Sequence, residues 1–322
     1  MTHGFSDAIL SLPTPDKHPA WLELRRQQLI RLLGGFPVRS PLNAKVVKRK
    51  EEADRVVELV QYESEPGEVI PAVVMIPKHR TPPLPAVLCH HQHAGQYELG
   101  KSEVCGWAGN PQQAYAAELC ARGYVTLSPD TICFEERRDP RFDGEQYERF
   151  LSHELLLKGW TLQGKMIWDV KRAVEYLCTR PEVDKQRLGM IGHSMGAAET
   201  WFSLSLEPKL KVGVASCATT TFASILAAGA IHNYGLYVPG LLQWGDTPDI
   251  VSMIAPRPFF MLTGEQDWRF PVSGAKEVYT RAKMMYQRLG AGEAIDLHIS
   301  PGPHEFNDEM RSRAYNWIDR WL

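Results

Sequence analysis

The chain has 322 residues, of which 44% are hydrophobic and 23% are charged. This is the composition of an ordinary globular protein, and the length suffices for a large core. The 36 basic and 38 acidic residues nearly balance, and no basic stripe is interleaved with aromatic residues. The charge therefore gives no reason to expect nucleic acid as a partner. We therefore expect the partner to be a small molecule.

In chain order, the patterns predict a helix, an antiparallel meander, and then strands alternating with helices. Leucine-rich helical periodicity runs over residues 21–33 and ends at Gly34-Gly35. Strand patterns at 44–48, 55–62 and 69–76, with the turn signal Pro66-Gly67 between the last two, predict antiparallel pairing. Later strands are predicted at 86–89, 124–127, 187–191, 211–215, 259–262 and 295–299, and helices at 112–122, 168–178, 273–289 and 309–321. Such alternation predicts an α/β fold with a doubly wound, mostly parallel sheet.

The chain contains no internal repeat and no long glycine-serine linker. We predict an N-terminal helical extension at residues 1–43, followed by one catalytic domain at residues 44–322. Within that domain, residues 135–164 and 218–249 are interpreted as cap-like insertions. Both leave the carboxyl ends of predicted strands, the sheet edge at which ligands bind in such folds.

Three features bear on location and redox state. Residues 212–245 contain no charged side chain and must be tested as a membrane span. Serines, threonines, an asparagine and a proline interrupt this stretch, and its start is typical of a buried parallel strand, so we predict no membrane partner. Residues 1–7 lack the basic start and apolar core of a secretory signal, which favours a cytoplasmic location. The six cysteines show no close pairing, and we interpret them as reduced, mostly buried thiols.

The strongest motif is Gly192-His193-Ser194-Met195-Gly196, which lies between a predicted strand and a helix-like run. Glycines on both sides allow a sharp turn that exposes a serine hydroxyl to a base. We therefore predict that Ser194 is a nucleophile. The alternative is a glycine-lined turn with no catalytic role.

A serine nucleophile needs a base and an acid that orients the base, and two later loops supply candidates. Asp267 follows the predicted strand 259–262, and His304 follows the strand 295–299. The order Ser, Asp, His is that of α/β-hydrolases. Glu265 is the alternative acid, while Asp267 as a helix cap and His304 as a core histidine are the structural alternatives.

Backbone N–H groups are expected to stabilise the oxyanion. One is that of Met195, at the predicted start of a helix, where the dipole favours negative charge. The second is assigned to Gln92 or His93 in the histidine-rich loop 90–95, and the choice between them stays open. His91 and His93 also suggest a metal site, but serine chemistry needs no metal. We interpret these histidines as bracing the loop, and we expect no metal and no cofactor.

The chain resembles the α/β-hydrolase superfamily, and within it the dienelactone-hydrolase-like and acetyl-xylan-esterase-like carboxylesterases, from about residue 44 to the C-terminus. The segments that carry the resemblance are 90–95 with 100–101, 128–130 with 134–137, 192–196, 237–242, 264–271 and 303–306. Dienelactone hydrolases proper have a cysteine at the position of Ser194. The resemblance therefore implies the esterase branch, with hydrolysis of carboxylic esters through an acyl-enzyme.

The same residues leave other functions open. Thioesters, lactones or amides are alternative substrates for the same three residues, and a catalytically silent small-molecule binding protein is an alternative of another class. Lys101 and Arg137 are candidates for contacts to a substrate carboxylate or to sugar hydroxyls, although such residues often form salt bridges. Tyr237 and Trp268 are candidates for the pocket wall, with core packing as the alternative. The acyl and alcohol groups, the conformation of the insertions and the oligomeric state stay open.

Overall fold

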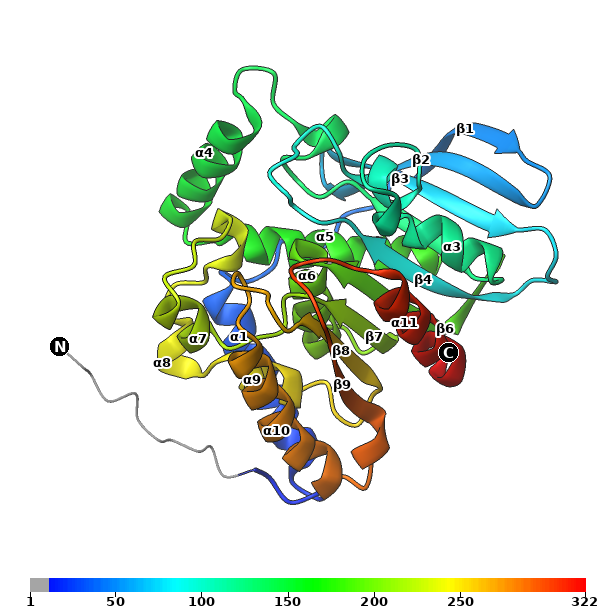
Figure 1. Cartoon of the computed structure of the whole chain (residues 1–322). Coiled ribbons are helices and arrows are strands. Elements are labelled where there is room, and N and C mark those ends of the chain that lie inside the picture. Colours follow the sequence, from blue (N-terminus) through cyan, green and yellow to red (C-terminus); the bar gives the residue numbers. More distant parts are fainter. Residues whose placement is uncertain (1–11) are drawn as a thin grey trace.

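The computed structural model describes residues 12–322 and contains one nine-stranded mixed sheet (Figure 1). The strands follow one another across the sheet as β1-β2-β3-β5-β4-β6-β7-β8-β9. Their bounds are β1 (Lys45–Glu51), β2 (Arg55–Glu65), β3 (Glu68–Pro77), β4 (Leu84–His90), β5 (Val125–Pro129), β6 (Val183–His193), β7 (Leu210–Ser216), β8 (Phe259–Gly264) and β9 (Ile295–Ser300). Neighbouring strands pair antiparallel from β1 through β2 and β3 to β5. They pair parallel from β5 through β4, β6, β7 and β8 to β9. The predicted α/β fold with an antiparallel N-terminal meander is confirmed.

Helices cover both faces of the sheet and fill the two inserted segments. The α-helices are α1 (His18–Leu32), α2 (Lys101–Val104), α3 (Tyr115–Ala121), α4 (Gly144–Leu157), α5 (Leu162–Leu177), α6 (Met195–Leu206), α7 (Phe222–Ala227), α8 (Leu241–Trp244), α9 (Thr247–Ser252), α10 (Val272–Arg288) and α11 (Asp308–Trp321). Residues 12–322 also contain four short 3-10 helices: η1 (Pro111–Gln113), η2 (Glu135–Arg137), η3 (Tyr234–Leu236) and η4 (Gly292–Ala294).

The central strands are apolar on both faces, as expected for a sheet covered on two sides. In β4, Ala86 and Leu88 join one buried cluster while Val87 and Cys89 join another. The first cluster takes in residues of α1, α5, α6 and α10, and the second those of α3 and α11. This double burial explains why these strands are continuous apolar runs rather than alternating ones.

Two helix boundaries differ from the predictions because polar caps, not apolar periodicity, define them. Thr161 accepts a hydrogen bond from the Gly164 N–H and starts α5 six residues before the predicted position of 168. The helix predicted at 112–122 is instead a 3-10 turn capped by Asn110, followed by α3. The early start of α5 brings its first turn to the pocket described below.

The two segments predicted as insertions lie next to each other. Residues 135–164 contain α4, and residues 218–249 contain α7, η3, α8 and the first part of α9. Residues of α4, α7 and α8 line one surface groove, and the three helices gather beside the sheet in Figure 1.

Residues 12–322 contain no helix with the length and apolar character needed to cross a membrane. The uncharged stretch 212–245 instead supplies most of β7 together with short helices. Residues 1–7, on which the expectation of no secretory signal was based, lie outside the described residues.

Candidate active site

Ser194 lies at the turn between β6 and α6, with φ 55° and ψ −117°. A positive φ is strained for a residue with a side chain, and such strain persists only where the surroundings enforce it. The Ser194 N–H donates to the Ser216 carbonyl at 2.8 Å, and the Ser194 carbonyl accepts from Ala197 and Ala198. These bonds to β7 and α6 hold the serine in its strained conformation.

Two glycines make this turn sterically possible. A Cβ atom on Gly196 would lie 2.2 Å from the carbonyl oxygen of His90, and one on Gly192 would lie 2.2 Å from the carbonyl carbon of Gly196. Both clashes are with backbone atoms, which cannot rotate away. The glycines therefore allow α6 to pass directly against the end of β4.

Asp267 and His304 lie on the loops after β8 and β9, as the sequence predicted. The His304 Nδ1 lies 2.7 Å from the Asp267 Oδ2. The other carboxylate oxygen of Asp267 accepts from the N–H groups of Arg269 and Phe270, at 3.0 and 3.1 Å. With the Asp267 side chain fully buried, this geometry favours the tautomer with a proton on Nδ1, which leaves Nε2 as an acceptor. Glu265, the alternative acid, is exposed.

Aromatic rings fix the His304 imidazole on two sides. Its centroid lies 5.5 Å from that of Phe270 and 4.9 Å from that of His193. Burial, together with the nearby His304, lowers the pKa of His193 well below its ordinary value. His193 therefore packs against His304 as a neutral ring and does not place a second charge there.

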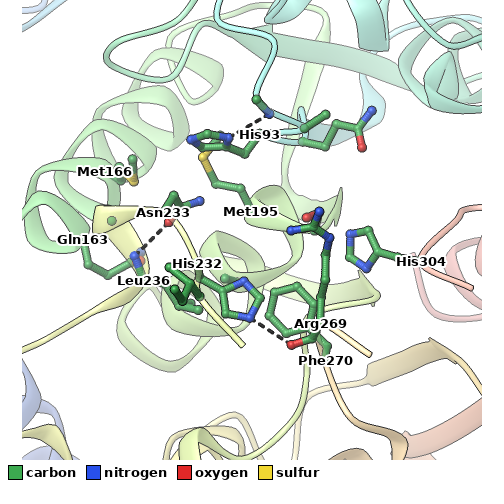
Figure 2. Close-up of a pocket in the computed structure, with 17 residues that line it drawn as sticks. His93, Gln163, Met166, Met195, His232, Asn233, Leu236, Arg269, Phe270 and His304 are labelled. Carbon is green, nitrogen blue, oxygen red and sulfur yellow. Dashed lines mark hydrogen bonds between the residues drawn. The ribbon is translucent and has the colours of Figure 1, made fainter. Parts of the chain in front are cut away.

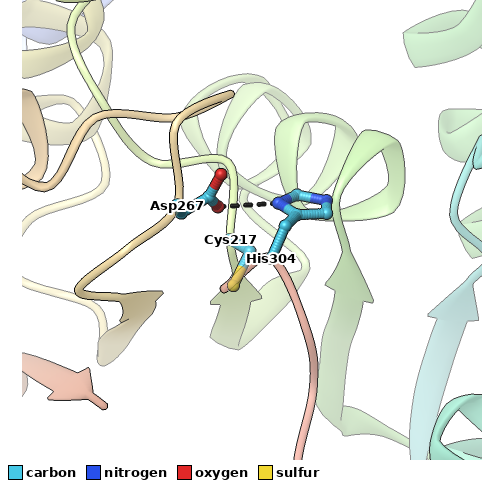
Figure 3. A group of neighbouring side chains, drawn as sticks. All are labelled: Cys217, Asp267 and His304. Carbon is cyan, nitrogen blue, oxygen red and sulfur yellow. Dashed lines mark hydrogen bonds and ion pairs between the residues drawn. The ribbon is translucent and has the colours of Figure 1, made fainter. Parts of the chain in front are cut away.

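Cys217 lies beside this pair, and ligand atoms of Cys217, Asp267 and His304 fall within 4.8 Å of one another (Figure 3). A metal ion would need a thiolate here. Burial raises the pKa of the Cys217 thiol to about 12, and its Sγ donates to the Glu305 carbonyl at 3.4 Å. We interpret Cys217 as a neutral part of the wall behind the Asp267–His304 pair.

The loop after β4 is braced by its histidines. Burial lowers the pKa of His91 to about 3. The neutral ring bonds to the Gln92 carbonyl through Nδ1 at 2.8 Å and accepts from the Thr131 N–H through Nε2 at 3.1 Å. His93 accepts from the Gly95 N–H at 3.0 Å, and its Nε2 lies 2.8 Å from a carboxylate oxygen of Glu148.

Glu148, on α4, joins this loop to both inserted segments. Its Oε2 also accepts from the Tyr97 hydroxyl at 2.6 Å, and its Oε1 accepts from the Tyr234 N–H at 3.0 Å. Burial alone would raise the pKa of this carboxyl, but the bonds from His93 and Tyr97 bring the net pKa below its usual value. A buried, ionised Glu148 thus connects α4, the loop after β4 and η3.

A cavity of about 510 Å³ brings the predicted residues together (Figure 2). Ser194, Met195 and His304 line it, as do Gln92 and His93 from the loop after β4. Met195 is the first residue of α6, so its N–H stands at the helix end that favours negative charge.

The structure does not bring the two predicted cationic contacts to this cavity. Lys101 is buried with its Nζ 2.7 Å from Asp130 and from Glu135, in an ion-pair cluster with Glu136. Although burial lowers the pKa of Lys101, these carboxylates raise it overall. Arg137 is likewise buried, 2.8 Å from both Asp169 and Glu68. Both side chains are occupied by structural carboxylates. The same Lys101 ammonium contacts all three carboxylates of the acidic group formed by residues 130, 135 and 136.

The two predicted aromatic contacts also lie outside the cavity lining. Tyr237 is 39% exposed and lines the separate groove along α4, α7 and α8. Trp268 is 64% exposed, and its ring lies under the guanidinium of Arg269 at 4.7 Å. The polar lining instead includes Gln163, Asn233 and Arg269, which the sequence interpretation did not single out as site residues. Of these three residues, only Arg269 could have been identified from the sequence as part of the site, because it follows Asp267 by two positions.

The model of the abhydrolase family matches residues 7–287. YtaP of Bacillus subtilis (strain 168), whose assignment as a hydrolase is provisional, is 32% identical over 301 residues, covering 92% of this chain and 99% of that protein.

Solved structures share the fold at low sequence identity. A provisionally assigned acetyl xylan esterase from Bacteroides fragilis NCTC 9343 matches with a TM-score of 0.75 and 18% identity, over 89% of this chain and 76% of that one. The glucuronoyl esterase from Solibacter usitatus matches with a TM-score of 0.71 and 16% identity, over 96% and 94%. These similarities confirm the predicted α/β-hydrolase fold.

Proposed function

This chain belongs to the abhydrolase family, and on that premise we propose that it is a serine carboxylesterase that cleaves small-molecule esters through an acyl-enzyme on Ser194. One observation carries the proposal. The strained serine of the β6–α6 turn and His304, which pairs with the buried Asp267, line the same cavity, and the three residues follow three different strands. The names of the two structural neighbours, an acetyl xylan esterase and a glucuronoyl esterase, add support for ester bonds.

In the proposed reaction, His304 Nε2 takes the Ser194 proton as the serine oxygen attacks the ester carbonyl carbon. Asp267 holds the Nδ1–H and stabilises the imidazolium that forms. The Met195 N–H and an N–H of Gln92 or His93 donate to the oxyanion. His304 then gives the proton to the leaving alcohol, and water repeats the sequence to release the acid.

The size of the cavity favours small substrates. A cavity of about 510 Å³ falls in the range of sites that enclose a drug-sized molecule. Sugar esters and aryl esters both fit this class. We therefore propose a preference for such esters over peptides.

The test is the rate of ester hydrolysis in variants of the proposed nucleophile and base. Ser194→Ala and His304→Ala are expected to lower kcat by about four to six orders of magnitude, because such residues act as a unit. Ser312→Ala, on the exposed side of α11, is the matched control and is expected to retain the wild-type rate. A fluorophosphonate probe should label the wild type and the control but not Ser194→Ala.

Three outcomes contradict the proposal. Full turnover by Ser194→Ala would remove the serine from the reaction. An unlabelled wild type with no activity would favour a silent binding protein. Faster cleavage of thioesters, lactones or peptides than of matched esters would assign the same residues to another acyl bond.

A further inference from the structure

Three side chains of the cavity wall carry nitrogen donors that the proposed reaction does not use and that bond to no other described residue: Gln163, Asn233 and Arg269 (Figure 2). Gln92 and His232 also line the cavity, but their Nε2 atoms bond to Glu103 and to the Arg269 carbonyl, respectively. Among the described residues that line the cavity, none is acidic. A wall with several donors and no carboxylate favours ligands that present oxygen acceptors and negative charge.

Gln163 lies in the first turn of α5 and is only 2% exposed. Its Nε2 is buried and has no hydrogen-bond partner within residues 12–322. A buried amide donor without an acceptor is costly, so native structures rarely keep one without a reason. Gln163 lines the cavity at a helix N-terminus, where negative charge is favoured, so a ligand oxygen that reached the amide would supply the missing acceptor.

Asn233 is held in one orientation by the local fold. Its side-chain oxygen accepts from the Leu236 N–H at 3.0 Å and caps η3. Since the oxygen is engaged with the backbone, the amide nitrogen is the free end of the side chain. Asn233 therefore adds a second neutral donor on the η3 side of the cavity.

Arg269 supplies the only lysine or arginine side chain in the described lining of the cavity. Its guanidinium lies over the Trp268 ring and makes no salt bridge with any residue in the range 12–322. Lys101 and Arg137, in contrast, are both saturated with carboxylates. A single guanidinium matches the single charge of a carboxylate better than the double charge of a phosphate, and its fork fits both carboxylate oxygens.

We propose that the substrate is an ester whose non-reacting part carries a carboxylate, bound by Arg269, and a further oxygen acceptor, bound by Gln163 with Asn233. This inference deepens the proposed function and rests on it. It assigns a chemical class, the anionic esters, to a cavity whose reacting residues would accept any ester.

The test compares esters that differ only in this charge. On the acyl side, the para-nitrophenyl monoester of adipic acid is compared with the same compound capped as a methyl ester. On the alcohol side, meta-acetoxybenzoate is compared with methyl meta-acetoxybenzoate. In the wild type, kcat/KM for the acid is expected to exceed that for its methyl ester about tenfold or more in one pair. High salt should reduce this preference, because the guanidinium is exposed and screened.

Arg269→Gln is expected to abolish the preference, so that kcat/KM for the acid falls to that for its methyl ester. Arg313→Gln, which removes a comparable exposed charge on α11, is the matched control and should keep the preference. Equal rates for acid and methyl ester in both pairs, or a preference that survives Arg269→Gln, would overturn the inference. In either case the Ser194-dependent hydrolysis of neutral esters would still support the proposed function.

Gln163→Met separates a ligand contact from a structural role. Methionine fills a similar volume without a buried donor, so the melting temperature should stay equal or rise. At the same time, KM for the preferred acid should rise about fivefold or more with kcat little changed. A fall in melting temperature with a parallel loss on all esters would make Gln163 structural and overturn its assignment. If no ester is hydrolysed in a Ser194-dependent way, the proposed function fails and this inference fails with it.

Discussion

Replacing Asp267 by asparagine is expected to reduce catalysis far more than it reduces stability. One carboxylate oxygen of Asp267 faces His304 and the other accepts two backbone N–H groups. Asparagine can keep its oxygen toward the two N–H groups, but its NH₂ then faces His304 Nδ1. The imidazole must turn to the tautomer with a proton on Nε2, which cannot accept the Ser194 proton.

The magnitudes follow from these contacts. The wrong tautomer should lower kcat/KM by about four orders of magnitude, or about 5 kcal/mol of transition-state stabilisation. Asparagine keeps both backbone bonds and should cost about 1–2 kcal/mol of unfolding free energy. Asp267→Ala leaves two N–H groups without an acceptor and should cost about 3–5 kcal/mol, from two bonds to a charged group.

The assay pairs ester hydrolysis with urea unfolding for Asp267→Asn, Asp267→Ala and the control Glu265→Gln. Glu265 is exposed, so its variant should match the wild type in both measurements. The reasoning is refuted if Asp267→Asn retains kcat/KM within about tenfold of the wild type. Equal stability of the asparagine and alanine variants would refute the account of the backbone bonds.

Three further results are expected. Glu148→Gln keeps the shape of the buried carboxylate but leaves fewer acceptors for its three donors. It should lower the unfolding free energy by about 2 kcal/mol, measured by urea unfolding, and kcat/KM by about tenfold, measured by ester hydrolysis. An unchanged rate would mean that the loop after β4 does not depend on its bonds to Glu148. Gly196→Ala should lower the unfolding free energy by about 3 kcal/mol or more, because the new Cβ would overlap the His90 carbonyl. Gly292→Ala, whose Cβ would meet only a side chain at 3.5 Å, is the control. Equal unfolding midpoints for the two variants would contradict the packing argument. For His91, the folded pKa of about 3 lies below the ordinary 6.5, so the folded state binds fewer protons and stability falls as pH drops from about 6.5 toward 3, by about 1.4 kcal/mol per pH unit. His91→Asn should show a correspondingly shallower fall between pH 7 and pH 5 (about 2 kcal/mol less) in urea unfolding, and identical slopes would refute it.

Sequence patterns predicted the strands well because parallel strands buried on both faces are recognisable without tertiary information. The proximity of Asp267 and His304 was predictable for a related reason, since both follow such strands at the same sheet edge. The roles of Lys101 and Arg137 were not predictable in this way. Their carboxylate partners, such as Asp130 and Asp169, lie about thirty residues further along the chain, and only the fold shows that these charges are already paired.

The polar wall of the cavity was missed because its position depends on caps and turns. Gln163 reaches the cavity only because Thr161 caps α5, so that the helix begins before the apolar periodicity does. Asn233 is oriented by a single 3-10 turn inside an inserted segment. Such features follow from local hydrogen bonds whose spacing is too short to distinguish from an ordinary loop.

The three hydrogen bonds of Glu148 also limit which segments can be exchanged between this chain and its relatives. The carboxylate comes from one inserted segment, while its donors come from the other segment and from the loop after β4. A chimera that imports residues 218–249 alone from a relative would have to reproduce the backbone position of Tyr234 to keep this anion satisfied. To transfer a substrate range from a relative, the two inserted segments and the loop after β4 should therefore be exchanged together. The hydrogen bonds of Glu148 then decide whether the exchanged segments are compatible.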